Sequence, residues 1–279
     1  MCGIALHRGS ETAFRDLPSP RYHGGVVVAL RFLALAATLA GCGRLNFGQA
    51  DRLADAAPDA TDAQTDAPVE KLPEGLILYL PFEGSSSGEI FRERQSGTLA
   101  SCGPCPTPVV GKVGQAARFD GTAEVLIPDS ATVRPAAFTI ALWEQLTSSS
   151  EATSLGKPLN SGTTTRNSFE FWERMGQCGF GVSYGGPPVF VERPGCSLLT
   201  WQHIAGTFDP AVGITLYIDG VLVGSTATTG TVAYATDPIT IGFDIDNGVD
   251  GFHINGNLDE MMLFNRALTP AEIAALAKR

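Results

Sequence analysis

Four oxygen-bearing side chains stand close together near the end of this 279-residue chain: Asp244, Asp246, Asn247 and Asp250. Carboxylate and amide oxygens are the donors that Ca²⁺ takes, about six to eight at a time. The segment departs from the helix–loop–helix calcium loop because Gly248 stands where a ligand is required. These residues are a candidate metal site, and the alternative is that Asp and Asn are present here to form turns.

Four cysteines could form disulfides: Cys102, Cys105, Cys178 and Cys196. Cys178 and Cys196 flank Gly185-Gly186, a hairpin signal, so a cross-strand bridge between them is expected. The Cys-Gly-Pro-Cys string from Cys102 to Cys105 has the spelling of a thioredoxin motif, but its flanks indicate a loop and not the helix start that stabilises a thiolate. A local disulfide that closes this loop is favoured, and pairing with Cys178 or Cys196 is the alternative.

Two strings place carboxylates close together, Phe169-Glu170-Phe171-Trp172-Glu173 and Leu258-Asp259-Glu260, and paired carboxylates can perform acid–base chemistry. Retaining hydrolysis of a glycosidic bond needs two carboxyl groups about 5 Å apart. In a strand over the first string, residues three apart point to opposite faces, so Glu170 and Glu173 do not form such a pair. No serine elbow, zinc-binding His pair or phosphate loop occurs in the sequence. We therefore assign no catalytic residue.

Strands must position most of these side chains. Ile214, Leu216 and Ile218 alternate with Thr215 and Tyr217, which predicts a strand with one buried face. In residues 138–143, Phe138, Ile140 and Leu142 alternate with Thr139, Ala141 and Trp143, two of which are also apolar, and this pattern predicts a strand covered on both faces. Asp219-Gly220 lies between two such runs and predicts a two-residue hairpin turn, which needs positive φ.

One helix is expected at the C-terminus. Thr269-Pro270-Ala271-Glu272 places a capping Thr, a Pro at the first helical position and a Glu at the third. Ile273, Leu276 and Ala277 then form a small apolar face. The predicted fold is therefore all-β: a two-sheet antiparallel sandwich or jelly roll over residues 75–279, with a short C-terminal helix.

The N-terminus indicates export. Residues 26–40 are almost entirely apolar and follow several arginines, which is typical of a signal peptide and too short for a comfortable membrane span. The run ends in Leu39-Ala40-Gly41-Cys42, which resembles the bacterial lipobox and predicts a signal peptide over 1–41 and acylation of Cys42. Gly43, where inner-membrane lipoproteins carry Asp, implies by resemblance an outer-membrane anchor. A start site within 26–28 is an alternative reading.

A tether is expected between the anchor and the sandwich. Residues 42–74 are rich in Ala, Asp, Thr and Pro, and their recurring Asp residues would repel one another on a helix. The whole chain has a formal net charge of -10, which excludes a general nucleic-acid partner because phosphate binding needs a basic face. Contact with a membrane is expected through the lipid anchor only.

Several blocks of the sequence resemble laminin-G-like, or concanavalin A-like, jelly rolls. The blocks occur in the order of that family and begin at Phe119-Asp120-Gly121, Phe138-Thr139-Ile140, Trp201-Gln202-His203, Leu216-Tyr217-Ile218 and Gly256-Asn257-Leu258. The resemblance implies two antiparallel sheets in a protein of the sugar-binding, adhesive or enzyme-accessory kind. It does not itself assign a ligand.

The resemblance also suggests site residues. Many such proteins hold a structural Ca²⁺, and Glu83, Asp120 and Asp259 stand at motif positions close to strand ends. Trp143 and Trp201 match family positions and are expected in the core, and His203 is expected to be structural. Trp172 is not explained by the motif, and we select it as the candidate ligand-binding platform, since aromatic faces beside polar groups suit sugars.

The leading functional hypothesis is a non-catalytic, cell-surface lipoprotein that binds a glycan or an extracellular protein. The first alternative is a glycan-active enzyme, because laminarinase-type glycosidases share the sandwich. The second alternative is a structural envelope protein without a small ligand.

Overall fold

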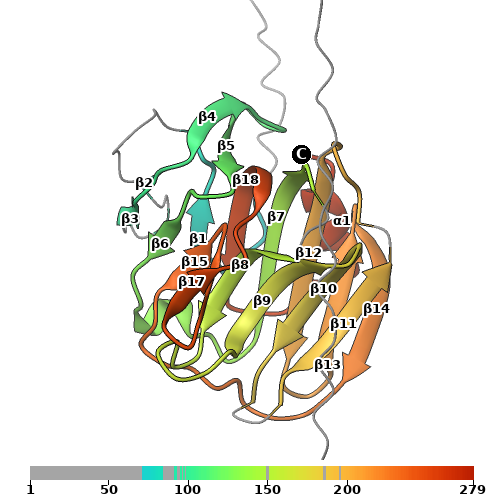
Figure 1. Ribbon diagram of the computed structural model, residues 1–279. Helices are drawn as coiled ribbons and strands as arrows, with labels where there is room; N and C mark the ends of the chain where they lie inside the picture. The colour runs from blue at the N-terminus through green and yellow to red at the C-terminus, as the bar shows by residue number, and fades with distance from the viewer. Residues whose placement is uncertain are drawn as a thin grey trace, which may run out of the picture. The chain divides into compact units, whose positions relative to one another are not determined.

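Short apolar runs separated by turn residues build two antiparallel sheets that face each other, with the strands β9, β10 and β11 in front of β7, β12 and β13 (Figure 1). The computed structural model describes residues 71–83, 91–92, 95, 97, 99–148, 151–184, 187–194 and 196–279. They belong to one unit, Thr65–Arg279; the other unit, Met1–Gln64, lies outside them. The predicted signal peptide, the Cys42 anchor, most of the tether and Gly185-Gly186 also lie outside the described residues.

The first sheet has the order β14 (Val221–Ala227), β13 (Gly213–Ile218), β12 (Gln202–Asp209), β7 (Phe138–Leu146), β18 (Asn255–Phe264), β5 (Gln115–Asp120) and β4 (Thr107–Val110), with β1 (Leu76–Leu80) also paired to β18. The second sheet has the order β11 (Val189–Pro194), β10 (Gln177–Val182), β9 (Asn167–Arg174), β8 (Ala152–Pro158), β15 (Ile239–Ile241), β6 (Val125–Ile127), β3 (Leu99–Cys102) and β2 (Phe91–Arg92). A separate hairpin joins β16 (Asp244–Asp246) to β17 (Val249–Gly251), a 3₁₀ turn covers Ala131–Val133, and α1 spans Pro270–Leu276. The predicted two-sheet sandwich with a short C-terminal helix is confirmed.

The core lies between the two sheets and is rich in phenylalanine. The ring of Phe138, on β7, lies 5.1 Å from that of Phe169 on β9 and 5.5 Å from that of Phe208 on β12. All three side chains are fully buried. Because β9 contributes Phe169 and Phe171 to this core, the residues between and beside them must point to the outer face of the second sheet.

The helix α1 covers the outer face of the first sheet. Ile273 and Leu276 pack in a second apolar cluster with side chains from β1, β7, β12, β13 and β18. In β7, Ile140 and Leu142 face the core between the sheets, whereas Ala141 faces outward and is buried by this second cluster. The strand is therefore covered on both faces, as the sequence predicted. The cluster also buries Tyr217 of β13, although the sequence predicted that this strand has only one buried face.

Local sequence signals for turns and caps are borne out. Asp219 and Gly220 both have positive φ in the turn between β13 and β14, and Asp219 Oδ1 accepts from the His203 amide at 2.9 Å. Thr269 and Glu272 form the reciprocal capping box at the start of α1. These contacts fix the ends of elements whose apolar residues alone would not define them.

Two disulfides join the predicted partners, Cys102 with Cys105 and Cys178 with Cys196. The second links β10 to the segment after β11. Within the part of the chain that the structure covers, no helix has the length and apolar character needed to cross a membrane.

Candidate functional site

A groove of about 540 Å³ runs over the outer face of the second sheet, across β8, β9, β10 and β11. Its lining is partly aromatic and partly acidic: Thr153, Glu170, Trp172, Phe190, Glu192, Asp244, Asp246 and Phe252 are among its residues. Trp172, the platform selected from the sequence, therefore lies in the groove and not in the core.

Glycines form the floor of the groove. In register across the sheet, Trp172 stands opposite Gly179, and Glu170 stands between Gly156 on β8 and Gly181 on β10. A Cβ on Gly179 would lie 2.2 Å from Trp172 Cε2, and a Cβ on Gly181 would lie 2.6 Å from Phe190 Cε1. The aromatic rings therefore lie directly on the glycine backbone, in space that any other residue would fill.

The aromatic wall consists of Trp172 and Phe190. Their ring centroids are 6.0 Å apart, and the planes are nearly perpendicular at 85°. Phe190 is 36% exposed, and Trp172 is partly exposed. This edge-to-face pair presents a broad apolar surface to the groove.

The acidic wall is organised by one buried amide. Asn167 Nδ2 donates to Glu170 Oε2 at 3.0 Å and to Asp244 Oδ2 at 2.7 Å. Burial, together with the charge of Asp244, raises the pKa of Glu170 to about 8. Burial also raises the pKa of Asp244 and of Asp246. Three carboxyl groups thus share a poorly solvated wall.

Asn167 is a residue that the sequence reasoning missed. It stands three residues before Glu170, so a regular strand would place the two on opposite faces. The pairing of β8 with β9 shifts register between Lys157 and Pro158, since Lys157 pairs with Phe169 whereas Pro158 pairs with Asn167. This bulge returns Asn167 to the groove face, and no feature of the sequence announces it.

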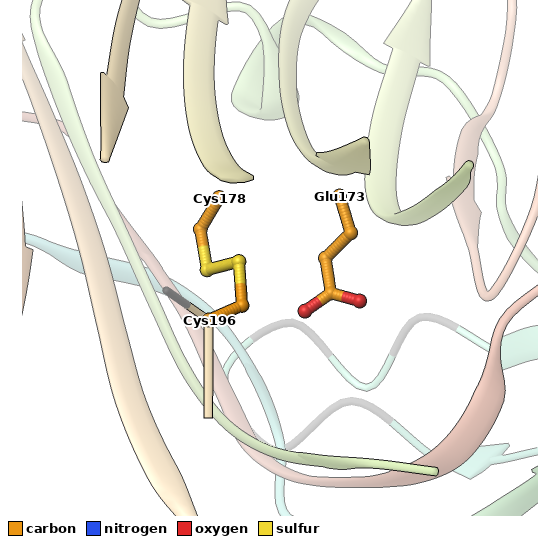
Figure 2. Close-up of side chains that lie close together, drawn as sticks. All are labelled: Glu173, Cys178 and Cys196. Carbon is orange, nitrogen blue, oxygen red and sulfur yellow. A yellow bond between two sulfur atoms is a disulfide. The ribbon is translucent and has the colours of Figure 1, made fainter. Parts of the chain in front are cut away.

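Glu173 lies on the opposite face of β9 from Glu170, as predicted. Its carboxylate is buried beside the Cys178–Cys196 disulfide, within 4.8 Å of both sulfur atoms (Figure 2). Burial and the neighbouring charge of Glu144 raise the pKa of Glu173 to about 8. Neither carboxylate oxygen of Glu173 has a hydrogen-bond partner among the described residues. Glu173 also contributes to the lining of the groove, but its carboxylate points away from that of Glu170, so the two do not form a catalytic pair.

The three carboxylates that the family resemblance suggested for Ca²⁺ do not converge. Glu83 Oε2 accepts from the Gln115 amide at 3.1 Å, and the fully buried Asp259 accepts from the Val113 amide at 2.9 Å. Both hold the turn that precedes β5. Asp120 lies at the other end of β5 and accepts from the amide of Thr122. Within the described chain no metal-ligand group contains any of these three.

The second predicted cluster is also divided. Asp244 and Asp246 line the groove. Asp250 pairs with Ile245 across the hairpin and so stands on its other face, and Asn247 occupies the turn with φ of 51°. The groove instead joins Asp244 to Glu170 and Asn167, which lie more than seventy positions earlier in the sequence.

The other aromatic and histidine expectations concern the core. Trp143 is buried and lies edge-on to the ring of His203 at 5.3 Å. Burial lowers the pKa of His203 to about 4, which keeps the ring neutral and fits the expected structural role. Trp201 is only half-buried and belongs to neither apolar cluster, so the expectation that it lies in the core is not met.

Comparison with known proteins gives a family and a fold. The family model described as the concanavalin A-like lectin/glucanases superfamily matches residues 119–274. No curated protein sequence matches the chain.

Three solved structures illustrate the similarity in fold. The binding domain of Paraclostridial Mosquitocidal Protein 1 gives a TM-score of 0.60 at 15% identity, over 73% of this chain and 52% of that one. Domain 4 of AbnA, an extracellular arabinanase from Geobacillus stearothermophilus, in complex with arabinotriose, gives 0.52 at 20% identity, over 72% and 98%. The receptor binding domain of botulinum neurotoxin type G gives 0.55 at 14%, over 73% and 51%. The chain thus spans about half the length of the two toxin domains.

Proposed function

The chain belongs to the concanavalin A-like lectin/glucanases superfamily, and we propose that its folded domain is a non-catalytic module that binds glycan chains in the groove. One observation carries the proposal. Trp172 lies on the glycine floor with its ring partly exposed, and the carboxyl groups of Glu170, Asp244 and Asp246 line the same groove. An apolar surface beside convergent polar groups suits a sugar ring, which has both kinds of surface.

The volume and the neighbours in fold support a glycan as the ligand. A groove of about 540 Å³ is in the range of small-molecule sites. The arabinanase domain of similar fold was solved with arabinotriose. An extracellular protein partner is the competing outcome, because the toxin domains of this fold are named for receptor binding.

A glycan array followed by titration calorimetry tests the proposal. The W172A variant should bind at least about tenfold more weakly than wild type, a loss of about 1.4 kcal/mol. Leu222→Ala is the matched control, because Leu222 is exposed on β14 of the other sheet and lies outside the groove. Equal affinity of W172A and wild type would refute the groove as the site. A well-folded protein that binds no glycan would favour a protein partner or a structural role.

Hydrolysis of a glycan is the second candidate function. It is favoured by the two carboxyl groups, Glu170 and Asp244, that accept hydrogen bonds from one Asn167 nitrogen. With a pKa of about 8, Glu170 is protonated at neutral pH, as a general acid must be. Release of reducing ends from β-glucans that disappears in E170Q but persists in E192Q would establish an enzyme. Absence of hydrolysis with intact binding would support the module.

We also propose that the protein is exported and anchored by a lipid on Cys42. The two disulfides support export, because disulfides form and persist in oxidising compartments. The lipobox-like sequence before Cys42 supports the anchor and an outer-membrane location. Metabolic labelling with palmitate in a bacterial host should label the wild type and leave Cys42→Ser unlabelled. Labelling of both would contradict the anchor.

A further inference from the structure

We propose that the acidic wall of the groove binds a calcium ion through Asn167 Oδ1, Asp244 Oδ1 and the hydroxyl of Thr240. These residues come from three strands, β9, β15 and β16. The proposal goes beyond glycan binding, because a cation can occupy this wall whether or not a glycan lies in the groove. Of the two sets of ligands that the sequence suggested, it keeps Asp244 from the second and none from the first.

The amide of Asn167 has an orientation fixed by its neighbours. The side chain is 2% exposed, and its Nδ2 donates to Glu170 and to Asp244. If the amide were flipped, Asn167 Oδ1 would face the oxygens of Glu170 and Asp244, and neither carboxyl group would receive a hydrogen bond from Nδ2. Oδ1 therefore lies on the opposite side of the amide, where it accepts no hydrogen bond from any described residue. A buried oxygen of this kind calls for a water or a cation.

Two further oxygens accompany the unpartnered Oδ1. From the position that a Cβ on Gly156 would take, Thr240 Oγ1 is 3.0 Å away, Asn167 Oδ1 is 3.3 Å away and Asp244 Oδ1 is 3.4 Å away. Thr240 Oγ1 donates to the Gly156 carbonyl at 3.1 Å, which leaves its lone pairs available. The three oxygens thus converge above a glycine, where a side chain would block them.

The carboxylate of Asp244 favours a cation at this site. No ion pair formed among the described residues includes Glu170, Asp244 or Asp246. The donors are carboxylate, amide and hydroxyl oxygens, with neither histidine nor thiolate, and this set matches the hard cation Ca²⁺ and not Zn²⁺. The irregular arrangement of three side chains suits the flexible coordination of Ca²⁺ better than the strict octahedron of Mg²⁺.

Such an ion would fasten the β16–β17 hairpin to the second sheet. Asp244 begins β16, and the turn of the hairpin donates two backbone hydrogen bonds to the segment between β8 and β9, from Asn247 N to the Thr164 carbonyl at 3.0 Å and from Gly248 N to the Ser161 carbonyl at 2.6 Å. Ligands on β9, β15 and β16 would add a link between elements that are distant in sequence. The ion would also reduce the negative charge that a ligand meets at this wall.

Calcium titration by calorimetry and thermal unfolding, after removal of divalent ions with EDTA, tests the inference. The wild type should bind Ca²⁺ with a dissociation constant on the order of 10⁻⁴ M, as extracellular modules do, and should melt at a higher temperature in its presence. Asp244→Asn should weaken binding by about tenfold or more. The quantity compared is the rise in melting temperature on adding Ca²⁺, because an Asn side chain can keep only one of the two hydrogen bonds that Asp244 accepts from Asn167 Nδ2 and Ile245 N, and metal-free D244N is therefore expected to melt lower than wild type.

Asp250→Asn and Glu83→Gln are the matched controls, each representing one set of ligands suggested by the sequence. Both should bind Ca²⁺ like wild type. Terbium luminescence sensitised by tryptophan gives an independent readout, which Trp172→Phe should diminish without changing calorimetric affinity. The inference is overturned if wild type shows no Ca²⁺ binding, or if E83Q or D250N loses it while D244N retains it. Glycan titrations in calcium and in EDTA keep the two proposals apart, since calcium binding without any glycan binding would refute only the function.

Discussion

At the scale of single residues, the groove depends on two positions of β10 that carry no side chain. Gly179 and Gly181 are in register with Trp172 and Glu170, and each leaves space that an aromatic ring occupies. The sequence marked Trp172 as unexplained by the family motif, and the structure gives the reason: its ring packs on backbone and not in the core.

A methyl group at Gly179 should therefore displace the indole. We expect Gly179→Ala to shift the tryptophan emission spectrum, to weaken glycan binding and to destabilise the fold by about 1–3 kcal/mol, the usual cost of overpacking. Gly162→Ala serves as control, because a Cβ there meets nothing within 4 Å. Fluorescence and chemical denaturation report both effects, and unchanged spectra in Gly179→Ala would show that the ring does not lie on the strand.

Glu173 should make stability depend on pH. Its pKa in the folded protein, about 8, is raised by burial and by Glu144 above the ordinary value near 4.5. Folding therefore takes up a proton between these values, and the stability present in acid is lost as the pH rises through about 8. We expect Glu173→Gln to be more stable than wild type at pH 9 and to show a flatter pH profile above pH 5. Denaturation curves across this range measure the difference, and parallel profiles would contradict it.

The sequence placed Glu170 and Glu173 on opposite faces correctly, because alternation along a strand is a local rule. It could not place Asn167, because a bulge depends on how β8 pairs with β9 and leaves no signature in either strand. Nor could it join Glu170 to Asp244, since that contact follows from the position of the β16–β17 hairpin. The face on which a residue of β9 lies was thus predictable from its neighbours in sequence, whereas the contacts between β9 and β16 that form the acidic wall were not.

At the scale of elements, α1 stabilises the outer face of the first sheet. Its apolar residues cover Ala141, Ala205 and Tyr217, and its first turn is closed by the Thr269–Glu272 capping box. Arg266 adds an ion pair to Glu272, and this pair lowers the pKa of Glu272 to about 2. The helix was predicted from its cap residues. The sequence did not predict that the helix covers the first sheet, although the apolar pattern of residues 138–143 indicated that the outer face of that strand is covered.

Thr269→Ala should loosen this end of the helix. We expect a loss of about 1 kcal/mol in the free energy of unfolding, the usual cost of losing a Thr cap. Thr229→Ala, an exposed threonine in the loop after β14, should leave stability unchanged. Equal stabilities of the two variants would show that the cap does not contribute. Hydrogen exchange would locate the effect in α1.

At the scale of the whole molecule, the fold class followed from the sequence because about two hundred residues of strand-forming pattern with one helix leave few architectures. The order of strands within each sheet did not follow, because long-range pairing such as β1 with β18 depends on contacts far apart in the chain. The glycine floor was hidden for the same reason, since glycines on β8 and β10 become neighbours only once those strands flank β9.

Reduction should affect the two disulfides unequally. Cys178–Cys196 closes a loop with a sequence separation of 18, and Cys102–Cys105 closes one with a separation of 3. Because stabilisation by a cross-link grows with the length of the closed loop, we expect the double variant C178S/C196S to lose about 2–4 kcal/mol and C102S/C105S to lose less. Urea denaturation of both variants measures this. A larger loss in C102S/C105S would contradict the expectation.

Leu72 and Leu76 pack against the same apolar cluster as α1, on the outer face of the first sheet. Residues 72–76 therefore lie on the face of the sandwich turned away from Trp172 and Phe190. The beginning of the folded domain and the proposed glycan groove are separated by the full thickness of the two sheets, so a ligand in the groove need not contact the first residues of the domain.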